Sequence, residues 1–194
     1  MVMSEISLDR VTEALVACLT SGRGADQVAE ALNFEVKDLA FHPRPDAADL
    51  PQEGLRATLR YWQDLPQVEG VAEVAKVDPA QMMAALGYLM LVDVGDGPND
   101  FRYRLYGTKI AKVAGFDMTG RTVWQIATSS AIQTLFAACY RAVCELRCPL
   151  YTVHRAPPHI TASHWHRLIL PLGQGGKVTR FLVCNMPIQN GKLV

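Results

Sequence analysis

The chain has 194 residues, of which 49% are hydrophobic and 20% are charged, proportions typical of a globular domain with a buried core. The 19 Lys and Arg residues balance the 19 Asp and Glu residues, so no overall field attracts nucleic acid or an anionic membrane. The length suits one domain with an appendage. We therefore expect no nucleic-acid partner and no membrane partner.

The start of the chain and its cysteines indicate where the protein works. Residues 1–9 lack the basic start and apolar stretch of a signal peptide, and no apolar run approaches the roughly 18 residues of a membrane span. The cysteines are odd in number and contain no CxxC pair, which favours reduced thiols. They are Cys18, Cys139, Cys144, Cys148 and Cys184. We expect a cytoplasmic protein.

The first fifty residues form a predicted helical extension. Apolar residues recur at helical spacing from Leu8 to Leu19, Ser7 is placed to cap the helix, and Ser21-Gly22 ends it. A second helix is predicted over 26–32. The two prolines in 42–46 then break regular structure. We therefore divide the chain into an N-terminal helical extension, residues 1–50, and a main domain, residues 51–194.

The first half of the main domain mixes short helices with a hairpin. Helices are predicted over 51–63 and after Asp78-Pro79, where Asp78 suits the cap position and Pro79 the first turn. Residues 88–94 and 101–106 are apolar or alternating, with a turn-rich segment between them, so they predict paired strands. Another short helix is expected between Gly107 and Gly115.

The second half contains the clearest helix and three more strands. Apolar residues follow steps of three and four after Ser129 or Ser130, and Pro149 stops the pattern, which predicts a helix over 130–148. Strands are predicted over 151–155, 163–172 and 178–187. This order predicts an α+β fold with a five-stranded antiparallel sheet and helices on one face, behind the N-terminal helical segment.

Several ordered motifs resemble a bacterial family of small, mostly stand-alone PAS domains. The similarity covers about residues 54–186. Its motifs are Trp62 at a helix end, Asp78-Pro79, the strand Phe101–Leu105, Gly107-Thr108, the turn Gly115–Arg121, and Leu170-Pro171-Leu172. The resemblance implies a PAS-like five-stranded sheet packed against helices, in a module used for sensing or docking. It implies neither a particular ligand nor a set of functional residues, because PAS-like folds carry many ligands or none.

The PAS arrangement places small ligands between the sheet and the long helix. Wall candidates here are Trp124, Phe136, Cys139 and Tyr140, although aromatic residues at helical spacing are more often plain core. A carboxylate or phosphate would need a cation, and the candidate polar anchors are Arg102, Arg104 and Arg121, which equally suit a solvated or partner-docking face. No cofactor is indicated, so its identity stays open.

Other chemistry is weakly supported. His164 and His166 share a strand face near His154 and His159, but no paired carboxylate accompanies them, so we expect no metal site. Cysteines four apart on the long helix suit a buried core better than a redox pair. No nucleophile motif occurs, so we expect no catalytic residues and no enzyme.

We therefore predict a PAS-like sensory or protein-interaction module in bacterial signalling, which binds a small ligand and acts on a partner regulatory protein. The apolar face of the first helix needs a cover, either its own domain or a second copy, so a homodimer through this helix is expected. The alternatives are a small-molecule-binding or enzymatic α+β domain, and a purely structural interaction domain with a filled core.

Overall fold

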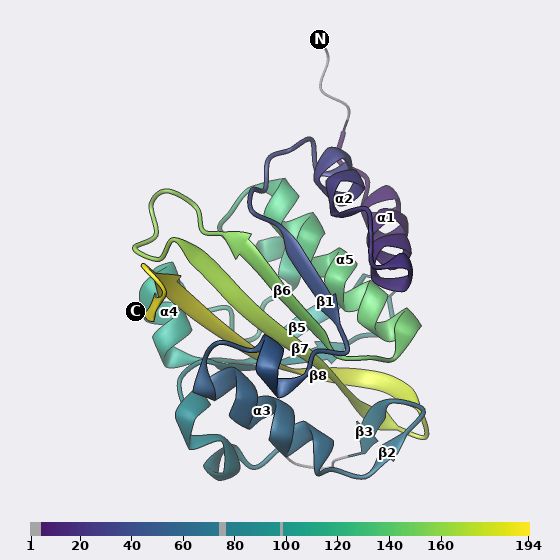
Figure 1. Ribbon diagram of the computed structural model, residues 1–194, viewed down its shortest axis with the longest axis vertical. Helices are drawn as coiled ribbons and strands as arrows, with labels where there is room; N and C mark the ends of the chain where they lie inside the picture. Colours follow the sequence, from purple (N-terminus) through teal and green to yellow (C-terminus); the bar gives the residue numbers. More distant parts are fainter. Residues whose placement is uncertain (1–4, 74–76, 98) are drawn as a thin grey trace.

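The computed structural model describes residues 5–73, 77–97 and 99–194. Figure 1 shows a twisted sheet with helices packed around it. The main path of the sheet runs in the order β1-β6-β7-β8-β4-β5, and every neighbouring pair on it is antiparallel. These strands are β1 (Ala40–Pro43), β6 (Leu150–Arg155), β7 (His164–Gln174), β8 (Lys177–Gln189), β4 (Leu89–Val94) and β5 (Phe101–Tyr106).

The five strands predicted from the sequence are therefore confirmed as one antiparallel sheet. Its centre is the long pairing of β7 with β8, in which Arg167 lies directly opposite Asn185. Because side chains alternate along a strand, Arg167 shares one sheet face with Asn185, while Leu168 and Cys184 share the other. This register brings Arg167 and Asn185 together on the face that also carries the buried Thr152 and His154 of β6.

Helix α5 (Ser130–Leu146) covers the face that carries Arg167. The Ser129 side chain accepts a hydrogen bond from the Ile132 backbone N–H, as predicted for a cap, and Arg147 ends the helix in a left-handed conformation. The Tyr140 ring stacks on Phe181 of β8 with 4.9 Å between ring centroids. The short helix α4 (Thr108–Ala114) contacts β8 beside it.

Helix α3 (Glu53–Gln63) covers the opposite face, so helices lie on both faces of the sheet and not on one as expected (Figure 1). The Trp62 indole N–H donates to the Pro171 carbonyl at 2.9 Å. A Cβ on Gly54 would lie 2.0 Å from Cε of Met186, which shows how closely α3 approaches β8. Both faces of β7 and β8 carry buried apolar residues, and each face therefore needs a cover.

The N-terminal segment packs against the same chain. Helix α1 (Leu8–Ser21) lies along α5 with Val11 and Leu15 fully buried, and Asp9 pairs with Arg141 of α5. Helix α2 (Ala25–Ala31) follows it. The apolar face of α1 is thus covered within the chain, and the expected homodimer through this helix stays a prediction.

Strand β1 lies in the segment that we expected to be irregular. Phe41 and Pro43 pair with Thr152 and Leu150 of β6, so that part of the sequence prediction is wrong. Proline lacks a backbone donor, but β1 is the edge of the main sheet, where one missing donor is tolerated. The extension therefore contributes a strand to the sheet, and the predicted division at residue 50 stays a prediction.

The remaining elements are short. The helix expected after Asp78 is the 3₁₀ helix η2 (Pro79–Ala85), and the Asp78 side chain accepts from the Ala80 N–H at 3.1 Å. Strand β3 pairs with β2 and, in parallel, with β7, which the sequence did not predict. Within the described residues no helix is both long and apolar enough to span a bilayer. The other elements are η1 (Ala47–Asp49), β2 (Gln67–Val68), β3 (Val71–Glu73), η3 (Val123–Gln125) and β9 (Lys192–Leu193).

Candidate functional site

A small cavity of about 40 Å³ lies between α5 and the face of β7 and β8 that α5 covers. Its wall combines aromatic rings from several elements with a few polar side chains. The wall includes Phe136, His154, Trp165, Arg167 and Asn185, and the loop between β6 and β7 adds Pro157, His159 and Ile160. A mostly apolar wall with a few converging polar groups is typical of small-molecule sites, which are usually larger, at about 300–1,000 Å³.

Arg167 is the main polar group of this cavity. The residue is only 2% exposed, and its guanidinium carbon lies 3.7 Å from the centroid of the Phe136 ring and 5.8 Å from that of Tyr140. Its Nε and Nη1 are buried and have no hydrogen-bond partner in the part of the chain that the structure describes. Buried arginine is normally paired and fully hydrogen-bonded, so this cation lacks what such a group requires.

The neighbouring Asn185 has a similar deficit. It is buried, lies opposite Arg167 on β8 and lines the same cavity. Its Oδ1 receives no hydrogen bond from any described residue. Side chains directly opposite each other on antiparallel strands have Cβ atoms about 5 Å apart. Unpaired donors and an unpaired acceptor are therefore buried next to one another beside the cavity.

The hydroxyl groups near Arg167 do not neutralise it. The Tyr140 hydroxyl donates to the Tyr103 hydroxyl at 3.4 Å, and burial raises the pKa of Tyr140 well above its usual value. Burial likewise raises the pKa of Tyr106, which lines the cavity. These phenols stay neutral at physiological pH, and they leave the charge of Arg167 uncompensated.

His154 of β6 is also neutral. It is buried, and its ring meets Phe136 edge-on at 5.4 Å between centroids. Burial, and next the charge of Arg167, lowers the pKa of His154 to about 3. The histidine therefore adds hydrogen-bonding capacity to the cavity wall without adding positive charge.

The predicted wall residues lie in different places. Phe136 lines the cavity, whereas Cys139 and Tyr140 are buried beside Arg167 without lining it. Burial raises the pKa of Cys139 to about 12, so its thiol stays protonated. Trp124 is 38% exposed, and its indole N–H donates to the Asn99 carbonyl at 3.0 Å, so it does not form the wall.

The predicted polar anchors Arg102, Arg104 and Arg121 lie on the surface and do not line the cavity. Arg102 donates to the Gly120 carbonyl at 2.8 Å, and Arg104 pairs with Asp93. The buried arginine is instead Arg167, which the sequence reasoning missed. Arg167 follows Trp165 by two residues in an alternating strand, so both side chains lie on one face, and this pattern could have identified it.

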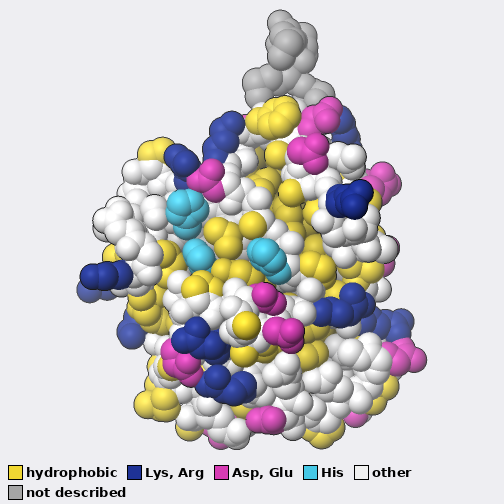
Figure 2. All heavy atoms as spheres, in the orientation of Figure 1, with side chains coloured by type: hydrophobic (Ala, Val, Ile, Leu, Met, Phe, Trp, Pro, Cys, Tyr) yellow, Lys and Arg dark blue, Asp and Glu magenta, His cyan; other side chains and the backbone are white. Residues whose placement is uncertain are grey.

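His42, His164 and His166 lie on the opposite, partly open face of the sheet. His42 stacks on Tyr151 at 5.5 Å between centroids, and the Tyr151 hydroxyl lies 2.6 Å from Nδ1 of His166. Figure 2 shows histidine side chains near one another on this face, among hydrophobic ones. His164 pairs instead with Asp38. No three His, Cys, Asp or Glu residues of the described ranges are grouped to hold a metal ion.

The thiols offer no sign of redox chemistry. Burial raises the pKa of Cys144 to about 11 and that of Cys184 to about 12, and it raises the pKa of Cys148 as well. A thiol needs a lowered pKa and exposure to react as a thiolate. Cys144 is partly buried and the other four are buried, and the expectation of ordinary core cysteines stays a prediction.

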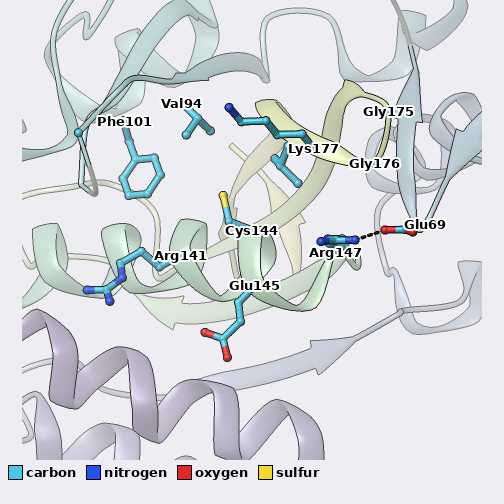
Figure 3. Close-up of a pocket in the computed structure, with 12 residues that line it drawn as sticks. Glu69, Val94, Phe101, Arg141, Cys144, Glu145, Arg147, Gly175, Gly176 and Lys177 are labelled. Atoms are coloured by element: carbon cyan, nitrogen blue, oxygen red, sulfur yellow. Dashed lines mark hydrogen bonds and ion pairs between the residues drawn. The ribbon is translucent and has the colours of Figure 1, made fainter.

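A larger hollow of about 560 Å³ lies at the other end of α5 and is open to solvent (Figure 3). Arg147 pairs there with Glu69, and Arg141 extends from α5 away from Cys144. Charges of both signs line this hollow, and Arg141 pairs outside it with Asp9 of α1. It lacks the buried unpaired atoms that distinguish the Arg167 cavity.

A family model described as "PAS domain" matches residues 50–184, well over half of the chain. The chain belongs to the PAS domain family. No match was found among curated proteins or among solved structures. The PAS-like α+β fold predicted from the sequence motifs is thus confirmed, and this PAS domain is a generic sensory or interaction module.

Proposed function

We propose that this PAS domain is a sensory module that binds a small molecule in the Arg167 cavity and reports its presence to a partner regulatory protein. The observation that carries the proposal is the unpaired, buried guanidinium of Arg167 on the cavity wall. An uncompensated buried cation costs several kcal/mol, on the order of the penalty for desolvating one ion. A ligand that pairs with it would recover much of this cost and would therefore bind.

The signal would pass through α5. Phe136 of this helix touches both the cavity and Arg167, while Arg141, further along the same helix, pairs with Asp9 of α1 at 2.5 Å. A ligand that favours one packing of α5 on the sheet shifts the population of that packing. The outer surface of α1 then changes position or mobility, and this surface would contact the partner.

Native mass spectrometry of the purified protein tests ligand binding. We expect a species heavier than the apo chain by a small molecule that is released on denaturation. Ala114 is buried and lines the cavity, so Ala114→Leu should fill it and reduce the occupied fraction. Ala17 is exposed on α1, and the matched variant Ala17→Leu should keep the occupancy of the parent protein.

A domain with a purely structural role would give a different result. Its spectrum would contain only the apo mass, and no fraction of a cell metabolite extract would raise its thermal unfolding temperature. If Ala114→Leu and Ala17→Leu retain the ligand in the same fraction of molecules, the ligand binds outside the cavity. Either result would contradict the proposed function.

A further inference from the structure

We infer that the loop between β6 and β7, residues 156–163, is a gate over the Arg167 cavity, and that Asp38 of the N-terminal segment latches this gate shut. The inference rests on the proposed function and adds how access to that site is controlled. Because Asp38 follows α2 in the chain, the latch also connects the cavity to the segment that carries α1 and α2.

The loop separates the cavity from two spaces on the surface of the molecule. Pro157 lines the cavity of about 40 Å³, an outer groove of about 520 Å³ and a solvent-open depression of about 440 Å³. Ile160 lines the cavity and the depression, and His159 lines the cavity and the outer groove. The side chains of this loop are therefore a thin wall between the buried space and solvent.

The size of the cavity indicates that this wall has to move. Small-molecule sites usually measure about 300–1,000 Å³, which is far more than the cavity offers. Displacement of Pro157 would join the cavity to the outer groove, and the combined space falls within that range. The arrangement with a cavity of about 40 Å³ is therefore the closed state of the gate.

Few hydrogen bonds hold the loop itself. Within the described residues, the span 157–162 makes one, from the Ile160 N–H to the Pro157 carbonyl at 3.0 Å, and both groups belong to the loop. At the base of the loop the Ala156 N–H donates to the Ser163 carbonyl at 2.9 Å. A segment with so few bonds to the rest of the chain opens at a low cost in free energy.

Asp38 holds both ends of this loop. Arg155 ends β6, His164 begins β7, and the two residues lie directly opposite each other in the ladder. Oδ2 of Asp38 accepts from Nε of Arg155 at 2.7 Å and lies 3.0 Å from Nε2 of His164. The Arg155 backbone N–H also donates to the Lys37 carbonyl at 3.0 Å. One carboxylate thus ties the last pair of the β6–β7 ladder to the segment after α2.

The latch depends on the charge of Asp38. The hydrogen bond from Arg155, and next the one from His164, lowers the pKa of Asp38, so its carboxylate is ionised at neutral pH. All three side chains are partly exposed to solvent, and an ion pair in such a position is weak. A weak latch opens and closes reversibly, as control of access to a binding site requires.

The test replaces Asp38 by asparagine. Asp38 has a φ of 53°, a left-handed conformation that suits Asn as well as Asp, so Asp38→Asn removes the charge and keeps the backbone. Hydrogen–deuterium exchange of the full chain should become about two- to fivefold faster for amides of residues 156–163, the range that weak ion pairs support. Asp26→Asn, exposed on α2, is the control and should exchange like the parent protein.

The fluorescence of Trp165 provides a second readout. Trp165 is buried and lines the same cavity as the loop, so acrylamide reaches it only when the gate opens. In a chain that also carries Trp124→Phe, which removes the exposed tryptophan, Asp38→Asn should increase quenching by acrylamide. Arg155→Gln should have a similar effect, and its addition to Asp38→Asn should change little further, because both substitutions break one contact.

Three results would overturn the inference. Unchanged exchange of residues 156–163 in Asp38→Asn contradicts the latch. An equal increase in exchange throughout β7 and β8 would show that Asp38 stabilises the whole fold and not the loop. Unchanged quenching of Trp165 would show that movement of the loop does not open the cavity.

These measurements need no bound molecule, so they are independent of the proposed function. If exchange and quenching change as expected while native mass spectrometry finds only the apo mass, the gate stands and the proposed function is wrong. If a molecule is retained that Ala114→Leu excludes while Asp38→Asn behaves like the parent protein, the proposed function stands and the gate is wrong.

Discussion

The guanidinium carbon of Arg167 lies 3.7 Å from the ring centroid of Phe136, so a buried cation of β7 faces an aromatic ring of α5. A cation over a ring gains about 2 kcal/mol when desolvated, which is less than the several kcal/mol that burial of an unpaired charge costs. The contact therefore orients Arg167 but does not compensate its charge.

This balance predicts that Arg167 weakens the apo protein. We expect Arg167→Met to leave the free energy of unfolding unchanged or to raise it by about 1–3 kcal/mol, because an apolar chain of similar length replaces a buried charge. Urea denaturation of ligand-free protein measures the change. Arg102→Met, on the surface, should change stability by no more than about 0.5 kcal/mol. A loss of more than 2 kcal/mol, on the order of one broken buried pair, would show that Arg167 is already paired.

His154 predicts a loss of stability in acid. Its pKa falls from 6.5 in the unfolded chain to about 3 in the fold, so below pH 6.5 the unfolded chain binds a proton that folded His154 does not. Above pH 6.5 His154 is neutral in both the folded and the unfolded chain, so its protonation does not reduce stability. As the pH falls from 6.5 toward 3, the free energy of unfolding falls by about 1.4 kcal/mol per pH unit, because only the unfolded chain takes up the proton.

His154→Gln should flatten the dependence of stability on pH between 4 and 6.5 by about this slope, measured by urea denaturation at several pH values. His159→Gln, at an exposed position in the loop between β6 and β7, is the control and should follow the parent protein. Parallel curves for the parent and His154→Gln would contradict the buried, neutral state assigned to His154.

The N-terminal helix should be an integral part of the folded chain. Leu15 of α1 is fully buried in the common core, so Leu15→Ala should lower the free energy of unfolding by about 2–4 kcal/mol. Glu13→Ala, exposed on the same helix, should be nearly neutral. Equal stabilities would mean that α1 is not docked on α5 in solution, and light scattering would then show whether a second copy covers it.

The close packing of α3 on β8 predicts that a larger side chain at Gly54 destabilises the fold. A Cβ there would lie 2.0 Å from Cε of Met186 and 2.8 Å from the Ala84 carbonyl oxygen. Gly54→Ala should therefore lower the free energy of unfolding by about 1–3 kcal/mol, although alanine favours the helix. Met186→Leu in the same chain removes the distal methyl and should recover part of the loss. A stabilising Gly54→Ala would contradict the close packing of α3 on β8.

Local patterns in the sequence explain why most of the fold was predictable. Helix α5 has a capping Ser129, helical apolar spacing and a stop at Pro149, and each signal lies within the segment that it describes. The hairpin of β4 and β5 likewise follows from two apolar runs and a turn-rich connection. For these elements local preference and tertiary packing agree.

The missed features depend on contacts between distant parts of the chain. Strand β1 contains Pro43, which locally favours a turn, and it exists because β6 offers an open edge about 110 residues later. The helical cover on the second face depends on the packing of Gly54 against Met186, which no local periodicity reveals.

The candidate site was missed for a similar reason. In the sequence, surface arginines next to turns are the more obvious anchors. Arg167 lies in a strand whose other face carries His164 and His166, and these histidines draw attention away from it. The alternation that begins at Trp165 places Arg167 on the inner face, but its lack of a partner depends on what α5 and β8 bring opposite it.

The most direct test of the central claim follows the Nε–Hε resonance of Arg167 by ¹H–¹⁵N NMR during titration with the small molecule that native mass spectrometry finds on the purified protein. We expect a saturable shift of this resonance, assigned by its loss in Arg167→Lys, while the Arg102 resonance stays unchanged. An Arg167 resonance that does not move when this molecule saturates the protein would contradict the claim that this buried guanidinium anchors the ligand.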